Sequence, residues 1–208
     1  MKPMGKLFVV EGLDGCGKGT VAAQMLKWFE DRNLPVYHSF EPGGSPFANA
    51  LRKELLSKEH DVPPMAEVLG MYCARIEHTQ NVLIPKLQAG INVVCERYYM
   101  SSIAYNHAAE VFDVHALCKP YILEPDATIF LDVDPETSMQ RVRNRKIEKG
   151  EEPDRIELKP REYFNKVHAM YMNNLQMIAN FHYIDGEQSR EDVAYNILEV
   201  LASVMDTE

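Results

Sequence analysis

The sequence has fewer positively charged residues than negatively charged ones. Its 208 residues include 22 Lys and Arg against 31 Asp and Glu, which gives a formal net charge of −9. The phosphate backbone of a nucleic acid repels such a chain overall, which argues against sequence-independent binding to nucleic acid. Any site for anions must therefore be a local basic pocket.

Paired cysteines and long apolar runs are also lacking. Four cysteines stand far apart, at Cys16, Cys73, Cys95 and Cys118. They form no C-x-x-C pair and no zinc-site spacing, so we expect reduced thiols. Near the N-terminus only residues 7–10 form an apolar run, which is too short for a signal peptide or a membrane span. We therefore expect a cytoplasmic protein with no membrane partner.

The apolar pattern predicts one α/β domain over residues 1–208. Strand-like runs are expected at 7–11, 35–40, 91–96, 126–133 and 181–185. Segments of helical spacing lie between and after them, at 18–32, 46–57, 64–84, 135–147, 160–180 and 189–205. This alternation predicts a five-stranded parallel sheet with helices on both faces. In such sheets ligands bind at the carboxyl ends of the strands.

A glycine-rich loop follows the first expected strand. It reads Gly12-Leu13-Asp14-Gly15-Cys16-Gly17-Lys18-Gly19-Thr20. The glycines let the backbone approach phosphate oxygens, and N–H groups at the start of the next helix supply donors. Lys18 adds a positive charge for the β- and γ-phosphates. The loop therefore predicts a P-loop for a nucleotide, although Gly19 stands where a Ser or Thr hydroxyl normally binds Mg²⁺.

Other polar groups follow the later strands. Glu96 and Arg97 come at the end of the third expected strand, and Ser101 and Tyr105 share one face of the helix expected after it. Arg97 has a planar fork that suits phosphate. A small polar ligand facing the P-loop is one interpretation, and a structural ion pair with capping serines is the other. Arg75 lies on a mostly apolar helix, so it must be paired or point into a polar cleft.

Residues 141–157 show the one shift in composition. Arginines are followed there by a break of Gly, Glu and Pro. This pattern is typical of a mobile basic flap, and equally of a solvated helix end followed by a surface loop. The segment alone does not decide between the two.

In their order along the chain, these motifs resemble the thymidylate kinase family. The matching residues are Gly12 to Thr20, Glu41-Pro42-Gly43-Gly44, Arg52, Ala74-Arg75, His78, Glu96-Arg97-Tyr98, Ser101, Ala104, Tyr105, Leu131-Asp132-Val133, Pro135-Glu136 and Asp154-Arg155-Ile156-Glu157. The resemblance covers nearly the whole chain. It implies a P-loop NTPase fold with a short lid at about 143–157, and phosphoryl transfer from ATP to dTMP with Mg²⁺. It also implies a homodimer formed through helices around 64–110.

The resemblance assigns expected roles to single residues. Arg52 and Arg97 would grip the acceptor phosphate, and Arg75 would reach the O4 side of a pyrimidine. The residues expected to contact dTMP are Asp14, Pro42, Arg52, Met71, Arg75, Arg97, Ser101, Ser102, Tyr105 and Asn106. Those expected to contact ATP are Gly12, Leu13, Asp14, Gly15, Cys16, Gly17, Lys18, Gly19, Thr20 and Arg143.

Catalysis is expected from Lys18, Asp14, Arg97, Arg145 and Arg155. Lid arginines are included because residues 13–16 lack the arginine that one branch of the family carries in its P-loop. Asp14 and Glu96 are expected to bind the metal ion, Glu96 through a water molecule.

Several positions depart from the family pattern. Glu96 replaces the usual Asp, Asn106 a common Gln, Met71 a common Phe and Phe40 the usual Arg before the Glu-Pro-Gly-Gly run. We hypothesise that the altered base pocket accepts dUMP or a 5-substituted pyrimidine nearly as well as dTMP. Two alternatives stay open: a kinase for another nucleoside monophosphate, and a P-loop switch that only binds nucleotide. The sequence has no Asn-Lys-x-Asp motif of a guanine-binding switch.

Overall fold

A five-stranded parallel sheet forms the centre of the computed structural model, which describes residues 4–106, 110–178 and 180–206. The strands are β1 (Leu7–Glu11), β2 (Val36–Phe40), β3 (Asn92–Glu96), β4 (Ala127–Asp132) and β5 (Phe181–Asp185). They lie in the order β2-β3-β1-β4-β5 with all neighbours parallel. This confirms the expected sheet.

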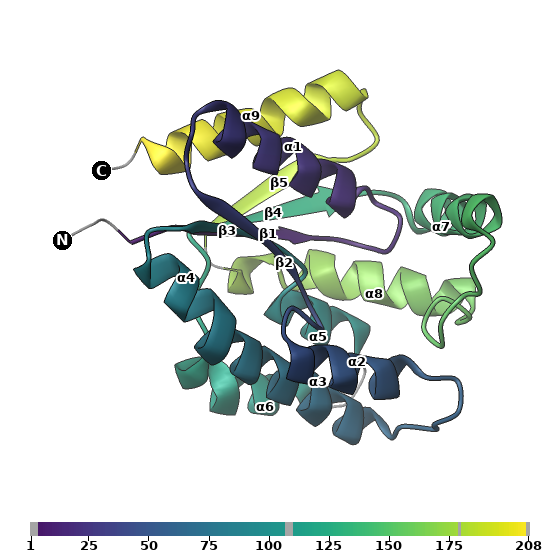
Figure 1. Ribbon diagram of the computed structural model, residues 1–208. Coiled ribbons are helices and arrows are strands. Elements are labelled where there is room, and N and C mark those ends of the chain that lie inside the picture. The colour runs from purple at the N-terminus through teal and green to yellow at the C-terminus, as the bar shows by residue number, and fades with distance from the viewer. Residues whose placement is uncertain (1–3, 107–109, 179, 207–208) are drawn as a thin grey trace.

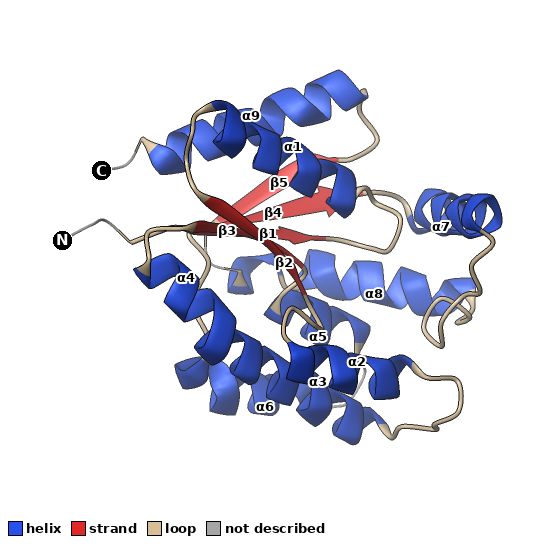
Figure 2. Cartoon of the chain, in the orientation of Figure 1, coloured by secondary structure: helices blue, strands red, loops and turns tan. Residues whose placement is uncertain are grey.

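Helices cover both faces of the sheet (Figures 1 and 2). They are α1 (Lys18–Asp31), α2 (Pro46–Leu56), α3 (Pro64–His78), α4 (Ile84–Gln88), α5 (Tyr99–Tyr105), α6 (Val111–Cys118), α7 (Pro135–Lys149), α8 (Arg161–Asn173) and α9 (Arg190–Met205). A π-helical turn occurs at Thr79–Leu83, and short 3-10 helices occur at Lys119–Tyr121 and Leu175–Met177. In Figure 1, α1 and α9 lie on one side of the sheet, and α5 and α8 lie on the other.

The two faces of the sheet contribute to two apolar cores. On β1, Leu7 and Val9 pack with residues of α3, α5 and α8, whereas Phe8 and Val10 pack with α1 and α9. Successive side chains of a strand point to opposite faces, so a continuous apolar run is what a strand buried on both sides requires. The same packing brings the carboxyl end of β1 between α1 and α5.

Two expected helices and the expected lid differ from the observed structure. The segment 64–84 divides at the π-helical turn Thr79–Leu83, which precedes Pro85 in the first turn of α4. A proline lacks the N–H that a continuous α-helix needs, and its ring clashes with the carbonyl four residues earlier. The helix therefore widens to a π-helical turn before Pro85. The helix expected over 160–180 ends at Asn173. Parts of the expected ranges 1–208, 64–110 and 160–180 lie outside the described residues.

The third difference concerns the expected lid. Residues 143–149 belong to α7, which ends at Gly150 in a left-handed conformation, as is common after a helix. In this structure the segment consists of a helix end and a following loop, and the expected mobile flap stays a prediction. The loop between α7 and α8 is shorter than the expected lid. No helix in the described ranges is long and apolar enough to cross a membrane.

Candidate functional site

The glycine-rich loop connects β1 to α1 at the carboxyl edge of the sheet. Gly12 has a φ of 137°, and a Cβ there would lie 2.6 Å from the carbonyl oxygen of Leu131, so only glycine fits without strain. The Nζ atom of Lys18 donates to the carbonyl oxygens of Leu13 at 2.8 Å and Gly12 at 3.2 Å. Burial and then the charge of Arg97 lower the pKa of Lys18. The loop thus holds its lysine over its own backbone.

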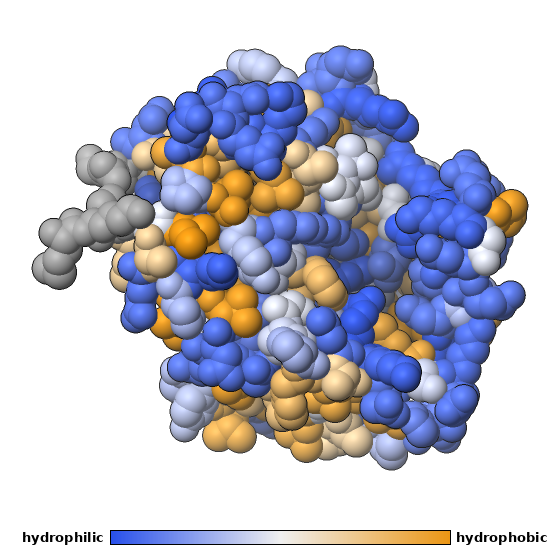
Figure 3. Space-filling view, viewed as in Figure 1, coloured by the Kyte–Doolittle hydropathy of each residue, from blue (hydrophilic) through white to orange (hydrophobic). Residues whose placement is uncertain are grey.

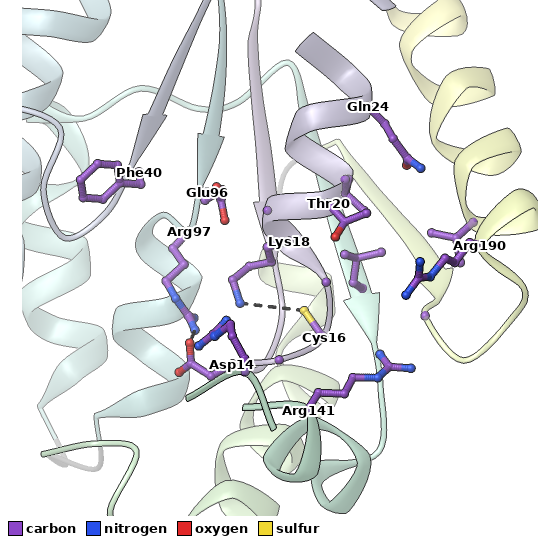
Figure 4. Close-up of a pocket in the computed structure, with 18 of the residues that line it drawn as sticks. Asp14, Cys16, Lys18, Thr20, Gln24, Phe40, Glu96, Arg97, Arg141 and Arg190 are labelled. Atoms are coloured by element: carbon purple, nitrogen blue, oxygen red, sulfur yellow. Dashed lines mark hydrogen bonds and ion pairs between the residues drawn. The ribbon is translucent and has the colours of Figure 1, made fainter. Parts of the chain in front are cut away.

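A cavity of about 860 Å³ opens at this loop, and we call it the P-loop cavity. Residues 14–21 form one wall, and side chains from the neighbouring elements complete it, including Gln24, Arg52, Glu96, Arg97, Arg141, Arg145, Gln188 and Arg190. In Figure 4, Arg97 and Arg190 lie on opposite sides of Lys18. The cavity therefore extends from the P-loop in two directions, towards β3 and towards α9.

Arg97 joins the P-loop to α5. Its Nη2 atom lies 2.6 Å from Asp14 Oδ1 and donates to the hydroxyl of Tyr105 at 3.1 Å. Its Nη1 atom donates to Ser101 Oγ at 3.0 Å and to the carbonyl oxygen of Gly12 at 3.2 Å. The backbone φ of Arg97 is 66°, which is unusual for a residue other than glycine. The fork therefore projects towards the loop at the cost of a strained backbone.

The pKa values of this cluster show a charged pair. Burial alone would raise the pKa of Asp14, but the charges of Arg97 and Lys18 outweigh burial and lower it. Burial alone would lower the pKa of Arg97, and Asp14 instead raises it well above its usual value. Both groups therefore stay ionised at neutral pH. Such a pair presents a fixed donor fork to an anion at the loop.

A second pocket shares Asp14, Arg52 and Arg97 with the P-loop cavity, and we call it the Arg75 pocket. Every residue expected to contact the acceptor lines it: Asp14, Pro42, Arg52, Met71, Arg75, Arg97, Ser101, Ser102, Tyr105 and Asn106. These residues come from five regions of the chain. The tertiary structure thus brings the expected set together.

Arg75 is both paired and aimed into a polar pocket. Its Nε atom lies 2.6 Å from Glu41 Oε2, and its Nη2 atom donates to Ser102 Oγ at 2.9 Å. The buried Nη1 atom has no hydrogen-bond partner within the described chain. His78 is a buried structural histidine, because its ring contacts Glu41 and Ser39. The free Nη1 group is a donor that a ligand acceptor can satisfy.

Glu96 lies beside the start of α1. A Cβ at Gly19 would come within 3.6 Å of Glu96 Oε2, and His38 Nε2 lies 3.0 Å from Glu96 Oε1. No group of three or more His, Cys, Asp or Glu side chains that could enclose a metal occurs among residues 4–106, 110–178 and 180–206. Mg²⁺ is usually held by one or two carboxylates together with substrate phosphates, so Glu96 and Asp14 fit this ion.

The lid arginines lie in different places. Arg145 lines the P-loop cavity, and its Nη2 atom lies 3.5 Å from Glu157 Oε1. Arg143 lies in a separate small pocket with Asp14 and Glu157. Arg155 instead donates to the carbonyl oxygen of Leu55 at 3.0 Å and pairs with Glu67 at 2.5 Å. Glu67 lines the Arg75 pocket, so Arg155 belongs to that side of the site in this structure.

Some residues of the P-loop cavity were not predicted. Arg141 lies in the arginine-rich segment and could have been included with Arg145, which follows one helical turn later. Gln24 and Arg190 carry no sequence signal, because each reaches the cavity only through the packing of α1 against α9. The Oε1 atom of Gln24 is buried without a hydrogen-bond partner in the described structure.

Comparison with known proteins agrees with this geometry. A family model described as thymidylate kinase matches residues 10–197. The protein named thymidylate kinase from Francisella tularensis subsp. holarctica (strain OSU18) is 35% identical over 203 residues, which cover 94% of this chain and 95% of that protein. The protein of the same name from Francisella philomiragia subsp. philomiragia is 33% identical over 205 residues, covering 95% and 98%.

Proposed function

The chain belongs to the thymidylate kinase family, and we propose that it transfers the γ-phosphoryl group of ATP to dTMP, giving ADP and dTDP for dTTP synthesis. One observation carries this proposal. The P-loop cavity and the Arg75 pocket meet at Asp14, Arg52 and Arg97, so two phosphorylated ligands would meet end to end there. ATP would occupy the P-loop cavity, and dTMP would occupy the Arg75 pocket.

The proposed mechanism relies on positioning and positive charge, which dominate phosphoryl transfer. Lys18 would leave the loop carbonyls and contact the β- and γ-phosphates of ATP. Arg97 would hold the acceptor phosphate in line with the γ-phosphate, and Arg145 would approach the transferred group from α7. Asp14 and Glu96 would hold Mg²⁺, which supplies further positive charge to the ATP phosphates. Movement of residues 143–157 over the site would exclude water.

The proposed acceptor is tested first by ADP release. The assay contains MgATP with dTMP, dUMP, 5-hydroxymethyl-dUMP, dCMP, UMP, AMP or GMP, beside a control without acceptor. Turnover that requires dTMP or a close relative supports the kinase. ATP hydrolysis that does not depend on an acceptor, or no turnover at all, would instead favour a P-loop switch.

We expect the kcat/KM for dUMP and 5-hydroxymethyl-dUMP to lie within about tenfold of that for dTMP. A missing methyl group in an apolar pocket typically lowers kcat/KM by about 10- to 200-fold. We expect the low end of this range, because the flexible Met71 side chain can fill the space that the methyl group leaves. The panel above measures this directly. Background turnover with both analogues, beside full activity with dTMP, would contradict the hypothesis.

We expect Arg145→Ala to lower kcat by about tenfold, because Arg141 one turn away keeps part of the positive charge at the cavity. Lys149→Ala is the matched control, since it removes an exposed cation from the end of the same helix. Arg155→Ala should mainly raise the KM for dTMP, because Arg155 contacts Glu67 in the Arg75 pocket. Steady-state kinetics of the three variants gives kcat and KM for each. A larger loss of kcat in Arg155→Ala than in Arg145→Ala would assign the catalytic role to Arg155 instead of Arg145.

We also propose a homodimer and a cytoplasmic location. Figure 3 shows hydrophobic residues gathered over α2 and α3, and Leu69 of α3 is one of the exposed apolar side chains there. The family resemblance supports pairing through this region. All four cysteines are free, which is typical of a reducing compartment. Light scattering of the purified chain tests the dimer, and a monomeric mass at assay concentration would contradict it.

A further inference from the structure

Glu11 is a buried carboxylate that the mechanism above does not use. It ends β1, directly before the P-loop, and its side chain is inaccessible to solvent. Its Oε1 atom accepts hydrogen bonds from the backbone N–H groups of Tyr98 at 2.8 Å and Ser101 at 3.1 Å. Its Oε2 atom accepts from Ser101 Oγ at 2.6 Å and from the hydroxyl of Tyr171 at 2.9 Å. Four donors thus satisfy a charge that would otherwise be costly to bury.

These contacts attach α5 to the strand that carries the P-loop. The residue before α5, Tyr98, makes no side-chain capping hydrogen bond, and the first N–H groups of a helix lack partners within the helix. Glu11 supplies the missing acceptor from β1. Glu11 thus adds a second link between α5 and β1, beside the contacts of Arg97 and Tyr105 with Asp14 in the P-loop.

Glu11 also reaches Arg97 through Ser101. Ser101 Oγ donates to Glu11 and accepts from Arg97 Nη1 at 3.0 Å. The other arm of Arg97 pairs with Asp14. The Arg97 guanidinium is thus held on one side by Asp14 inside the P-loop. On the other side it is held by Ser101, which in turn contacts Glu11, the residue just before the P-loop. Unlike Asp14, Glu11 lines neither the P-loop cavity nor the Arg75 pocket, so it has no contact with a ligand there.

We propose that Glu11 is a positioning residue for the acceptor phosphate. Through Ser101 it orients the Arg97 fork, and through the backbone of Tyr98 it sets the distance between Arg97 and the P-loop. The proposal rests on the proposed function, because it takes Arg97 as the ligand of the dTMP phosphate. It assigns Ser101, which also lines the Arg75 pocket, a relay role in addition to the acceptor contact implied by the family resemblance.

The test compares dTMP with thymidine, which has the same base and sugar but no phosphate. Glu11→Gln keeps the size of the side chain and removes its charge. We expect it to weaken dTMP binding by about tenfold, the typical effect of a hydrogen bond to a charged group, and to change thymidine binding by less than about twofold. Titration calorimetry on the full chain gives both dissociation constants.

Tyr171→Phe is the matched control. It removes a hydrogen bond to the same Oε2 atom and a contact with Ser101 Oγ at 2.9 Å, but it leaves the contacts of Ser101 with Glu11 and Arg97 in place. The ratio of the dTMP and thymidine affinities should therefore fall less than in Glu11→Gln. Ser101→Ala should lower the ratio of the dTMP and thymidine affinities as Glu11→Gln does. The double variant should lower this ratio little further, because both substitutions act on the same chain of contacts. Ser101→Ala also provides the test if Glu11→Gln does not fold.

Three results would overturn the inference. The first is an equal weakening of dTMP binding and thymidine binding in Glu11→Gln. The second is a fall of the dTMP-to-thymidine affinity ratio in Tyr171→Phe as large as that in Glu11→Gln. The third is an unchanged affinity ratio in Ser101→Ala. Each leaves the proposed function intact, since the unaltered chain would still bind and phosphorylate dTMP. Absence of dTMP binding by the unaltered chain would overturn the proposed function itself, and this inference with it.

Discussion

Lys18→Ala is expected to lower kcat by about 100-fold or more, with the fold unchanged. Lys18 is the one lysine that lines the described P-loop cavity, and its Nζ atom reaches the loop carbonyls that surround the expected phosphate position. Removing one preorganised electrostatic contact from a transition state typically costs two to three orders of magnitude in rate, roughly 10²–10³. The measurement is ADP release with saturating MgATP and dTMP.

Lys27→Ala is the matched control for Lys18→Ala. It lies on the same helix, but its side chain is 72% exposed and pairs only with Asp31. Exposed pairs of this kind contribute little to stability, so neither activity nor stability should change appreciably. Circular dichroism establishes that both variants are folded. A folded Lys18→Ala variant that kept most of its activity would remove the assigned role from the lysine.

Arg97→Ala is expected to show a loss of similar size, about 100-fold or more in kcat/KM for dTMP. Its guanidinium lines both pockets, and the alanine variant leaves Asp14 without this ion-pair partner. We expect the KM for dTMP to rise more than the KM for ATP, since the fork faces the acceptor phosphate. Steady-state kinetics with each substrate varied in turn separates the two effects.

Arg97→Lys distinguishes the charge of Arg97 from its shape. Lysine keeps the positive charge but offers no planar fork, so it cannot contact Asp14 and Ser101 at the same time as a phosphate. We expect it to recover less than a tenth of the lost activity. Arg161→Ala, which removes an exposed arginine paired with Glu136, should behave as the unaltered chain. Full activity in Arg97→Lys would mean that only charge matters at this position.

Much of the fold could be predicted because local patterns report it directly. The apolar run at 7–10 is buried on both faces of β1, and the glycine spacing after it forms the connection to α1. Both features depend on neighbours in sequence, which is why periodicity and turn chemistry identified them. The helix 111–118 was not predicted, and neither was the π-helical turn at Thr79–Leu83, although Pro85 just after it was visible in the sequence.

The candidate site was only partly predictable. The family resemblance pointed to Met71, Arg75 and Asn106, and the structure places all three in one pocket. Nothing in the sequence showed that Arg155 contacts Glu67, and Arg141 was left out although it lies one helical turn before Arg145. The contact of Arg155 depends on where α7 ends and on how the following loop packs, and neither leaves a periodic pattern.

The sequence by itself determined the parallel sheet, the phosphate-binding loop and the types of residue at the strand ends. These depend on backbone conformation and on the alternation of apolar and polar positions, which act over a few residues. Only the tertiary structure decided which charges are paired and which stay free. Glu11 and Arg97 are 86 residues apart in sequence, yet Ser101 contacts both. A buried charge is stable only where distant elements supply its donors, so its role depends on packing.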